Sequence, residues 1–161
     1  MTLRLRDAGR GDAGLVLHFI RALAEYERLA HEVAATEAEI DRFLFAEPRR
    51  AEALIAEWDG RPVGFAVWYY SYSTFLGRPS LYVEDVFVEP DSRGRGIGRA
   101  IFAHLAARAV GQGCGRMEWS VLDWNAPSIA FYRSIGARPR EGWTLQQLTG
   151  EALHALAAGK E

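Results

Sequence analysis

Cysteine is almost absent from this sequence, since Cys114 is the only one among 161 residues. A single cysteine cannot form a disulfide within the chain, so a hydrophobic core must hold the fold together, and a chain of this length can bury one. The four histidines are scattered, and none lies near cysteine with the spacing of a zinc site. The sequence therefore predicts no metal centre and fits a reducing compartment.

Long apolar runs are also lacking. No segment approaches the roughly 20 apolar residues that span a bilayer, and the first residues, MTLRLRDAGRGDAG, have no apolar core like that of a signal peptide. The 19 basic and 21 acidic side chains give a formal charge of -2, without the basic surplus that neutralises nucleic-acid phosphates. We expect a cytoplasmic globular protein that binds neither membranes nor nucleic acid.

Strand and helix patterns follow one another along the chain in an order typical of a mixed α/β sheet with helices on both faces. Alternating or apolar runs predict strands at 2–6, 53–58, 62–70, 81–88, 117–122 and 143–148. Helical spacing predicts helices at 15–26, 36–45, 97–109 and 125–135, with a further helix at the C-terminal end. Residues 71–80 are expected to form a polar and aromatic loop. No linker or repeat divides the chain, so we expect residues 1–161 to form a single domain.

The stretch EPDSRGRGIGRA, residues 89–100, lies where the strand 81–88 gives way to a helix. Unpaired N–H groups and the helix dipole make the start of a helix a site for phosphate. The glycines let the main chain approach such a ligand and the arginines add charge: Gly94, Gly96, Gly98, Arg93, Arg95 and Arg99. The stretch predicts a site for a di- or polyphosphate, with a loop of solvated arginines as the alternative. It lacks the Gly-Lys-Ser/Thr of a P-loop and the spacing of a dinucleotide fingerprint.

The run Arg93-Gly-Arg-Gly96-Ile-Gly98 resembles the Arg/Gln-x-x-Gly-x-Gly/Ala signature of the GNAT superfamily of N-acetyltransferases, and 125–132 resembles its second acetyl-CoA segment. Four segments are similar to the diamine (spermidine/spermine) acetyltransferases: 23–27, 81–88, 124–132 and 141–143. This resemblance, which runs nearly end to end, implies the GNAT fold and acetyl-CoA as cosubstrate, without a metal. It also implies direct transfer to a small amine in a ternary complex and, by analogy, a homodimer.

By this resemblance, the acetyl-CoA site comprises the end of the strand 81–88, the glycine turn and the start of a later helix. Its expected members are Val86, Phe87, Val88, Arg93, Gly94, Arg95, Gly96, Ile97, Gly98, Arg99 and Asn125. Main-chain N–H groups at a bulge within 86–88 are expected to bind the thioester carbonyl oxygen. Asn125 either bonds the pantetheine amide or simply caps its helix.

Acetyl transfer needs a base, because an alkylamine has a pKa of about 10.4 and is protonated at neutral pH. Glu84 and Asp85 are the candidates, and strand alternation points them to opposite faces. The resemblance favours Glu84 as the base, directly or through a water molecule, with Asp85 in a supporting or structural role. The alternative is that both carboxylates pair with basic groups of the fold. Tyr132 is the expected acid, because a phenol can donate a proton to the leaving thiolate.

Acidic and aromatic residues in the family-like segments predict the amine pocket: Tyr26, Glu27, Glu84, Asp85, Glu141 and Trp143. Carboxylates attract a cation, and aromatic rings can cover its charge or its methylene chain. Polyamine-acetylating relatives tend to place an acid after the hairpin, where this chain has Tyr72-Ser-Thr-Phe75. A diamine or a thialysine-like amino acid therefore fits at least as well as a long polyamine. A protein N-acetyltransferase and a non-catalytic acyl-CoA sensor are the alternative functions.

Overall fold

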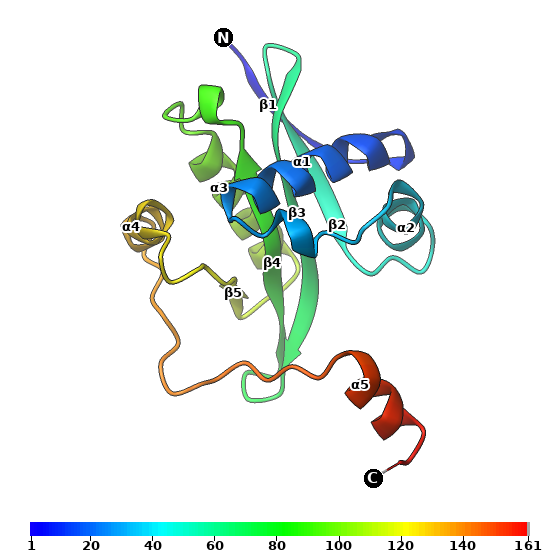
Figure 1. Cartoon of the computed structure of the whole chain (residues 1–161). Coiled ribbons are helices and arrows are strands. Elements are labelled where there is room, and N and C mark those ends of the chain that lie inside the picture. The colour runs from blue at the N-terminus through cyan, green and yellow to red at the C-terminus, as the bar shows by residue number, and fades with distance from the viewer. Residues whose placement is uncertain (161) are drawn as a thin grey trace. The chain divides into compact units, whose positions relative to one another are not determined.

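The structure, a computed structural model, describes residues 1–160 and divides into two compact units, Met1–Leu122 and the residues from Asp123 onward. The first unit is built on one five-stranded sheet with the order β1-β2-β3-β4-β5 (Figure 1). The strands are β1 (Leu3–Asp7), β2 (Glu52–Trp58), β3 (Arg61–Ser73), β4 (Arg78–Val88) and β5 (Arg116–Glu118). Neighbours are antiparallel except β4 and β5, which are parallel. The predicted mixed α/β class is confirmed.

Helices cover both faces of this sheet. They are α1 (Ala13–Tyr26), α2 (Glu37–Ile40) with the π-helical turn η3 (Asp41–Phe45), and α3 (Ile97–Gly111), with short 3₁₀ turns at η1 (Arg10–Asp12), η2 (Ala30–Glu32) and η4 (Pro90–Ser92). The predicted capping box begins α2, because Thr36 Oγ1 accepts from the Glu39 N–H at 3.2 Å and Glu39 Oε2 accepts from the Thr36 N–H at 3.0 Å.

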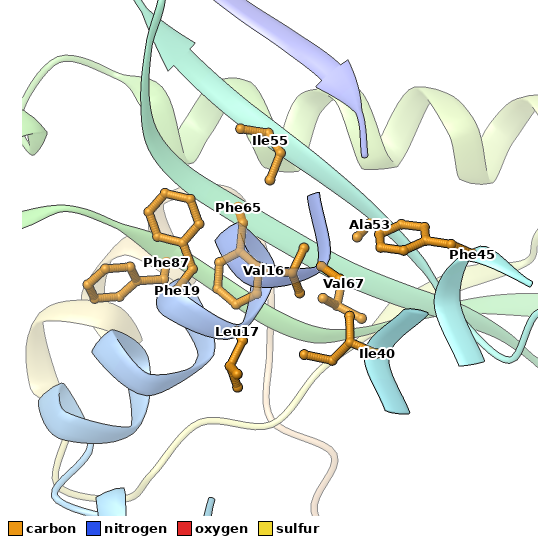
Figure 2. Packing of buried hydrophobic residues seen from close by; sticks show 11 residues of the cluster. Val16, Leu17, Phe19, Ile40, Phe45, Ala53, Ile55, Phe65, Val67 and Phe87 are labelled. Carbon is orange, nitrogen blue, oxygen red and sulfur yellow. The ribbon is translucent and has the colours of Figure 1, made fainter. Parts of the chain in front are cut away.

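Strand alternation divides the core between the two faces. Ile55, Phe65 and Phe87 pack under α1 and α2, whereas Leu54 and Trp68 pack against α3. On the α1 face, the ring of Phe19 stacks on that of Phe65 with centroids 5.4 Å apart, and Phe87 completes an aromatic cluster (Figure 2). Such ring contacts contribute about 0.5–1.5 kcal/mol beyond the area that they bury.

The two hairpins of the sheet differ in how well the sequence predicts them. Asp59 and Gly60 have φ of 49° and 78°, as a tight turn between β2 and β3 requires, so the predicted first hairpin is confirmed. The loop expected at 71–80 is wrong, because β3 and β4 stay paired up to Ser73 and Arg78. The alternating tyrosines and serines of 69–73 suit a strand, and this pattern extends the ladder.

The second unit contains α4 (Ala126–Ser134) and α5 (Gly150–Ala157). Asn125 caps α4, since its Oδ1 accepts from the Ser128 N–H at 3.3 Å, and Gly136, at φ 93°, follows its end. The strand predicted at 143–148 is wrong: no strand is formed there, and the side chains of Trp143 and Leu145 are 71% and 90% exposed. The strand predicted at 117–122 is shortened to β5. None of the helices within residues 1–160 has the length and apolar character needed to span a membrane.

We expect Gly64→Ala to destabilise the first unit, because a Cβ at this position of β3 would lie 2.5 Å from the main-chain oxygen of Phe87. Overpacking of this kind costs about 1–3 kcal/mol, or several degrees of Tm for a chain of this size. Thermal unfolding measures the effect, with Gly111→Ala as the control, since its Cβ would meet no atom within 4 Å. Equal melting temperatures for the two variants would contradict this close approach of β3 and β4.

Candidate active site

A β-bulge in β4 sets the directions of the candidate catalytic acids. Val67 pairs with Asp85 and Trp68 with Val83, which leaves Glu84 as the extra residue between the two pairs. Val83 belongs to the core on the α3 face, whereas Phe87 belongs to the core under α1. By alternation from Phe87, Asp85 is directed to the α1 face, while Glu84 is exposed.

The position of this bulge corrects one expectation from the sequence. The bulge was expected within 86–88, but these residues pair regularly with Ala66, Phe65 and Gly64 of β3. The side chain of Phe87 is buried under α1, and those of Val86 and Val88 pack against the α3-side core. The side chains of 86–88 are therefore part of the core, and only their main-chain groups could contact a ligand beside β4.

β4 and β5 separate soon after they pair. Their ladder joins Ser80, Leu81 and Tyr82 to residues 116–118, whereas β4 continues from Val83 to Val88. Over this continuation β4 has a strand partner on the β3 side alone, within the described part of the chain. Apart from the Val88 oxygen, which accepts from Arg93 Nε, backbone N–H and C=O groups on such an edge are available to a ligand that offers amide groups.

The glycine turn joins the end of β4 to α3, as the sequence predicts. Gly94 and Gly96 have φ of 76° and 77°, a left-handed conformation that glycine adopts without strain. Gly96 is the N-cap of α3, and no side chain accepts a hydrogen bond from the first turn. A Cβ at Gly94, Gly96 or Gly98 would meet no atom within 4 Å, so the turn is open. The side chain of Ile97 is buried, which leaves only its main chain to bind a ligand.

The arginines of the turn lie in different surroundings. Arg93 Nε donates to the main-chain oxygen of Val88 at 2.8 Å, and its guanidinium carbon lies 4.8 Å from the ring centroid of Tyr26. The guanidinium of Arg95 lies over Trp58 of β2, 5.3 Å from the ring centroid. Arg99 is exposed on the first turn of α3. The side chains of Arg93 and Arg95 are therefore oriented by aromatic residues of the first unit.

Acidic residues from α1 and β4 come together on the first unit. The pKa of Asp85 is raised to about 7, mainly by burial and further by the negative charges of Glu84 and Glu27. Burial also raises the pKa of Glu27, the C-cap of α1. None of these three carboxylates is in any ion pair found among residues 1–160, so the alternative in which they pair with basic groups is not observed. We call Glu27, Glu84 and Asp85 the acid cluster.

Two tyrosines near this cluster were not predicted from the sequence. Burial and the charge of Glu84 raise the pKa of Tyr69 on β3, and its ring lies 5.1 Å from that of Tyr82 on β4. The Tyr82 hydroxyl lies 3.0 Å from Ser120 Oγ, a contact between β4 and the chain after β5. Pairing across the sheet creates these contacts, so no local motif predicts them.

The remaining predicted residues belong to the second unit. Asn125 is buried at the start of α4, and Tyr132 is half-buried on the same helix with its ring 5.7 Å from that of Phe131. Glu141 and Trp143 are exposed on the chain between α4 and α5, where the guanidinium of Arg140 lies over Trp143 at 5.3 Å.

No three histidine, cysteine, aspartate or glutamate side chains gather as a metal site within residues 1–160. An open glycine turn, an unpaired edge of β4 and an acid cluster, all on one unit, can instead serve a phosphate-bearing ligand and a cation.

Comparison with known families assigns the chain. Residues 19–137 match the model of the acetyltransferase (GNAT) family. The chain belongs to this GNAT family. It is accordingly an N-acetyltransferase, the activity named for relatives that match it over almost its whole length.

Individual relatives and structures agree with this assignment. The chain is 38% identical to a thialysine N-epsilon-acetyltransferase of Bos taurus, with 95% of this chain and 96% of that protein covered. It is 32% identical to a spermidine/spermine N(1)-acetyltransferase-like protein of Homo sapiens, over 96% of this chain and 24% of that protein. The structure of an integron cassette protein from the mobile metagenome of V. cholerae superimposes with a TM-score of 0.80 at 26% identity, covering 98% of each chain.

We expect Asp85→Asn to raise stability at about pH 8 and to change it little at about pH 4. Asp85 has an ordinary pKa of 3.8 in the unfolded chain but about 7 in the folded one. The folded chain therefore holds more protons between these values, and the contribution of Asp85 to stability falls as the pH rises from about 4 to about 7. Asparagine removes this dependence.

Thermal unfolding from about pH 4 to pH 8 tests this expectation, with the exposed Asp91→Asn as the control. A gain of equal size at both ends of the range, or no gain at the alkaline end, would argue against the burial of an acid at position 85.

Proposed function

We propose that the chain transfers the acetyl group of acetyl-CoA directly to the primary amine of a small molecule, a diamine or a thialysine-like amino acid, within a ternary complex. The observation that carries this proposal is the path of β4, which leads from the acid cluster along an edge without a strand partner to the open glycine turn. The similarity to the bovine thialysine acetyltransferase supports the class of amine.

The chain's own residues fit acetyl-CoA. Main-chain N–H groups at the start of α3 would hold the pyrophosphate, because the turn is open and no side chain caps it. Main-chain groups of β4 between Val83 and Val88 would bond the pantetheine amides. When bound, acetyl-CoA supplies the acetyl group as an activated thioester.

The acid cluster would bind and deprotonate the amine. Glu84, exposed at the bulge, takes the proton, directly or through a water molecule. Asp85 is a second candidate for the base, because a carboxylate whose pKa is about 7 is well matched to proton transfer near neutral pH. Tyr26 and Glu27 would contact the remaining part of the substrate. Glu141 and Trp143 are further candidates for binding the amine, on the strength of the family-like segment 141–143 alone.

The proposed proton donor belongs to the second unit. Tyr132 donates a proton to the leaving thiolate, a role that rests on its place in the Asn125–Tyr132 motif. Asn125 caps α4, which favours the structural reading of this residue over a bond to pantetheine. The family match at 19–137 crosses the boundary between the two units, which supports a single acetyltransferase domain.

The assembly and the location of the chain are part of the same proposal. Exposed apolar side chains, with Phe75 at 94% and Leu145 at 90%, support a homodimer in which such residues are covered. A sedimentation mass near the 18.0 kDa of one chain would contradict it. The single cysteine supports a reducing, cytoplasmic location.

The proposal is tested by coenzyme A release from acetyl-CoA with spermidine, spermine, putrescine, thialysine, lysine and a peptide with a free N-terminus. We expect turnover with the short amines. Turnover with the peptide alone would identify a protein N-acetyltransferase. Tight binding of acetyl-CoA without release on any amine would favour an acyl-CoA sensor and overturn the proposal.

We expect Tyr132→Phe to lower kcat by about 100-fold or more, because general acid catalysis typically contributes this much. The KM for acetyl-CoA should change little, since the phenylalanine ring keeps the shape of the side chain. The control is Tyr72→Phe, which removes a hydroxyl from the exposed second hairpin. Unchanged turnover in Tyr132→Phe would remove this tyrosine from the mechanism.

A further inference from the structure

Arg93 makes three contacts within the first unit, two with residues of β4 and one with the last residue of α1. Its Nε donates to the main-chain oxygen of Val88, the last residue of β4, at 2.8 Å. Its guanidinium carbon lies 4.8 Å from the ring centroid of Tyr26, the last residue of α1, and 5.4 Å from that of Phe87. Arg93 itself begins the glycine turn, so its side chain connects this turn to the end of β4 and to the end of α1.

These contacts fix the direction of the guanidinium. A planar cation that donates to a carbonyl and lies over two rings is oriented by the protein before any ligand binds. A phosphate ligand would have to draw the side chain away from Val88 and the rings or share its remaining N–H groups. The main chain at the start of α3, in contrast, is open without rearrangement.

We infer that Arg93 is a positioning residue, which holds the end of α1 and the end of β4 against the glycine turn, and not a phosphate ligand. The inference rests on the proposed function, in which the turn binds acetyl-CoA and the end of α1 binds the amine. Glu27 follows Tyr26 directly, so a shift of Tyr26 moves one member of the acid cluster. Arg93 thereby couples the two substrate sites.

A double-mutant cycle with Arg93→Met and Tyr26→Leu tests this coupling. Each single variant should weaken acetyl-CoA binding about two- to fivefold, since each breaks the same contact. The double variant should bind acetyl-CoA no worse than the more affected of the two single variants. Additive losses in acetyl-CoA affinity would overturn the inference.

The ionic-strength dependence of acetyl-CoA affinity separates positioning from phosphate binding. Loss of a phosphate contact flattens this dependence, because salt screens one fewer attraction. We expect Arg93→Lys, which keeps the positive charge beside the turn, to have a higher Kd than the wild type and a parallel slope. A wild-type Kd in Arg93→Lys would make Arg93 a phosphate ligand and overturn the inference.

Two further variants complete the design. Arg42→Met removes an arginine that lies 5.0 Å from the Phe43 ring, outside the site, and should leave both substrates unaffected. Arg93→Lys keeps the charge without the planar fork and should not restore activity; full restoration would contradict positioning. If Arg93→Met fails to fold, as circular dichroism would show, the cycle is run with Arg93→Lys and the same expectation.

The binding cycle also distinguishes the inference from the proposed function. If the wild type binds acetyl-CoA but acetylates no amine, the proposed function fails, while non-additive Kd values still support the positioning role. A wild type that binds no acetyl-CoA overturns both.

Discussion

The separation of β4 from β5 after Tyr82 is the constraint on which the site of the first unit depends. A parallel pair of strands needs a crossover, and here α3 provides it, beginning at the turn beyond β4 and returning the chain to β5. A longer ladder would pair the backbone groups of 83–88 and close the edge that leads to the turn. In the proposed function, sheet pairing and ligand binding would compete for these groups, and the short β5 leaves them to the ligand.

The acid cluster reduces the stability of the fold that carries it. Asp85 and Glu27 are partly buried near like charges, and no basic side chain of the described chain forms an ion pair with them, which disfavours their ionised forms. The aromatic cluster of Phe19, Phe65 and Phe87 lies on the same face, two residues along β4 from Asp85, and offsets this cost. Local destabilisation of this kind is expected where a site needs perturbed groups.

Much of the fold follows from local sequence patterns. The Asp59-Gly60 turn, the Thr36–Glu39 capping box and the glycine turn each specify one backbone geometry, and the structure contains all three. The lengths of the strands follow from pairing instead: β3 and β4 extend because each is the other's partner, whereas 143–148 has strand-like residues and no strand partner within the described residues. Propensity alone could not separate these two cases.

The site shows the same division between local and long-range information. Motifs locate Glu84 and the glycines, but the bulge at Glu84 depends on the register of β3 against β4. The contact of Arg93 with Tyr26 joins residues 67 positions apart in the sequence, so a motif that contains Arg93 predicts its charge and not its orientation.

The charge state of the acid cluster explains why the proposed substrate is a cation. With the pKa of Asp85 at about 7, this carboxyl is about half protonated at neutral pH, which relieves repulsion among three nearby acids. An ammonium group that entered the cluster would lower that pKa, so Asp85 would release its proton and form a full ion pair with the cation. A neutral ligand gains nothing comparable. A protein that only binds acyl-CoA has no use for such a cluster, because its destabilising carboxylates would hold nothing.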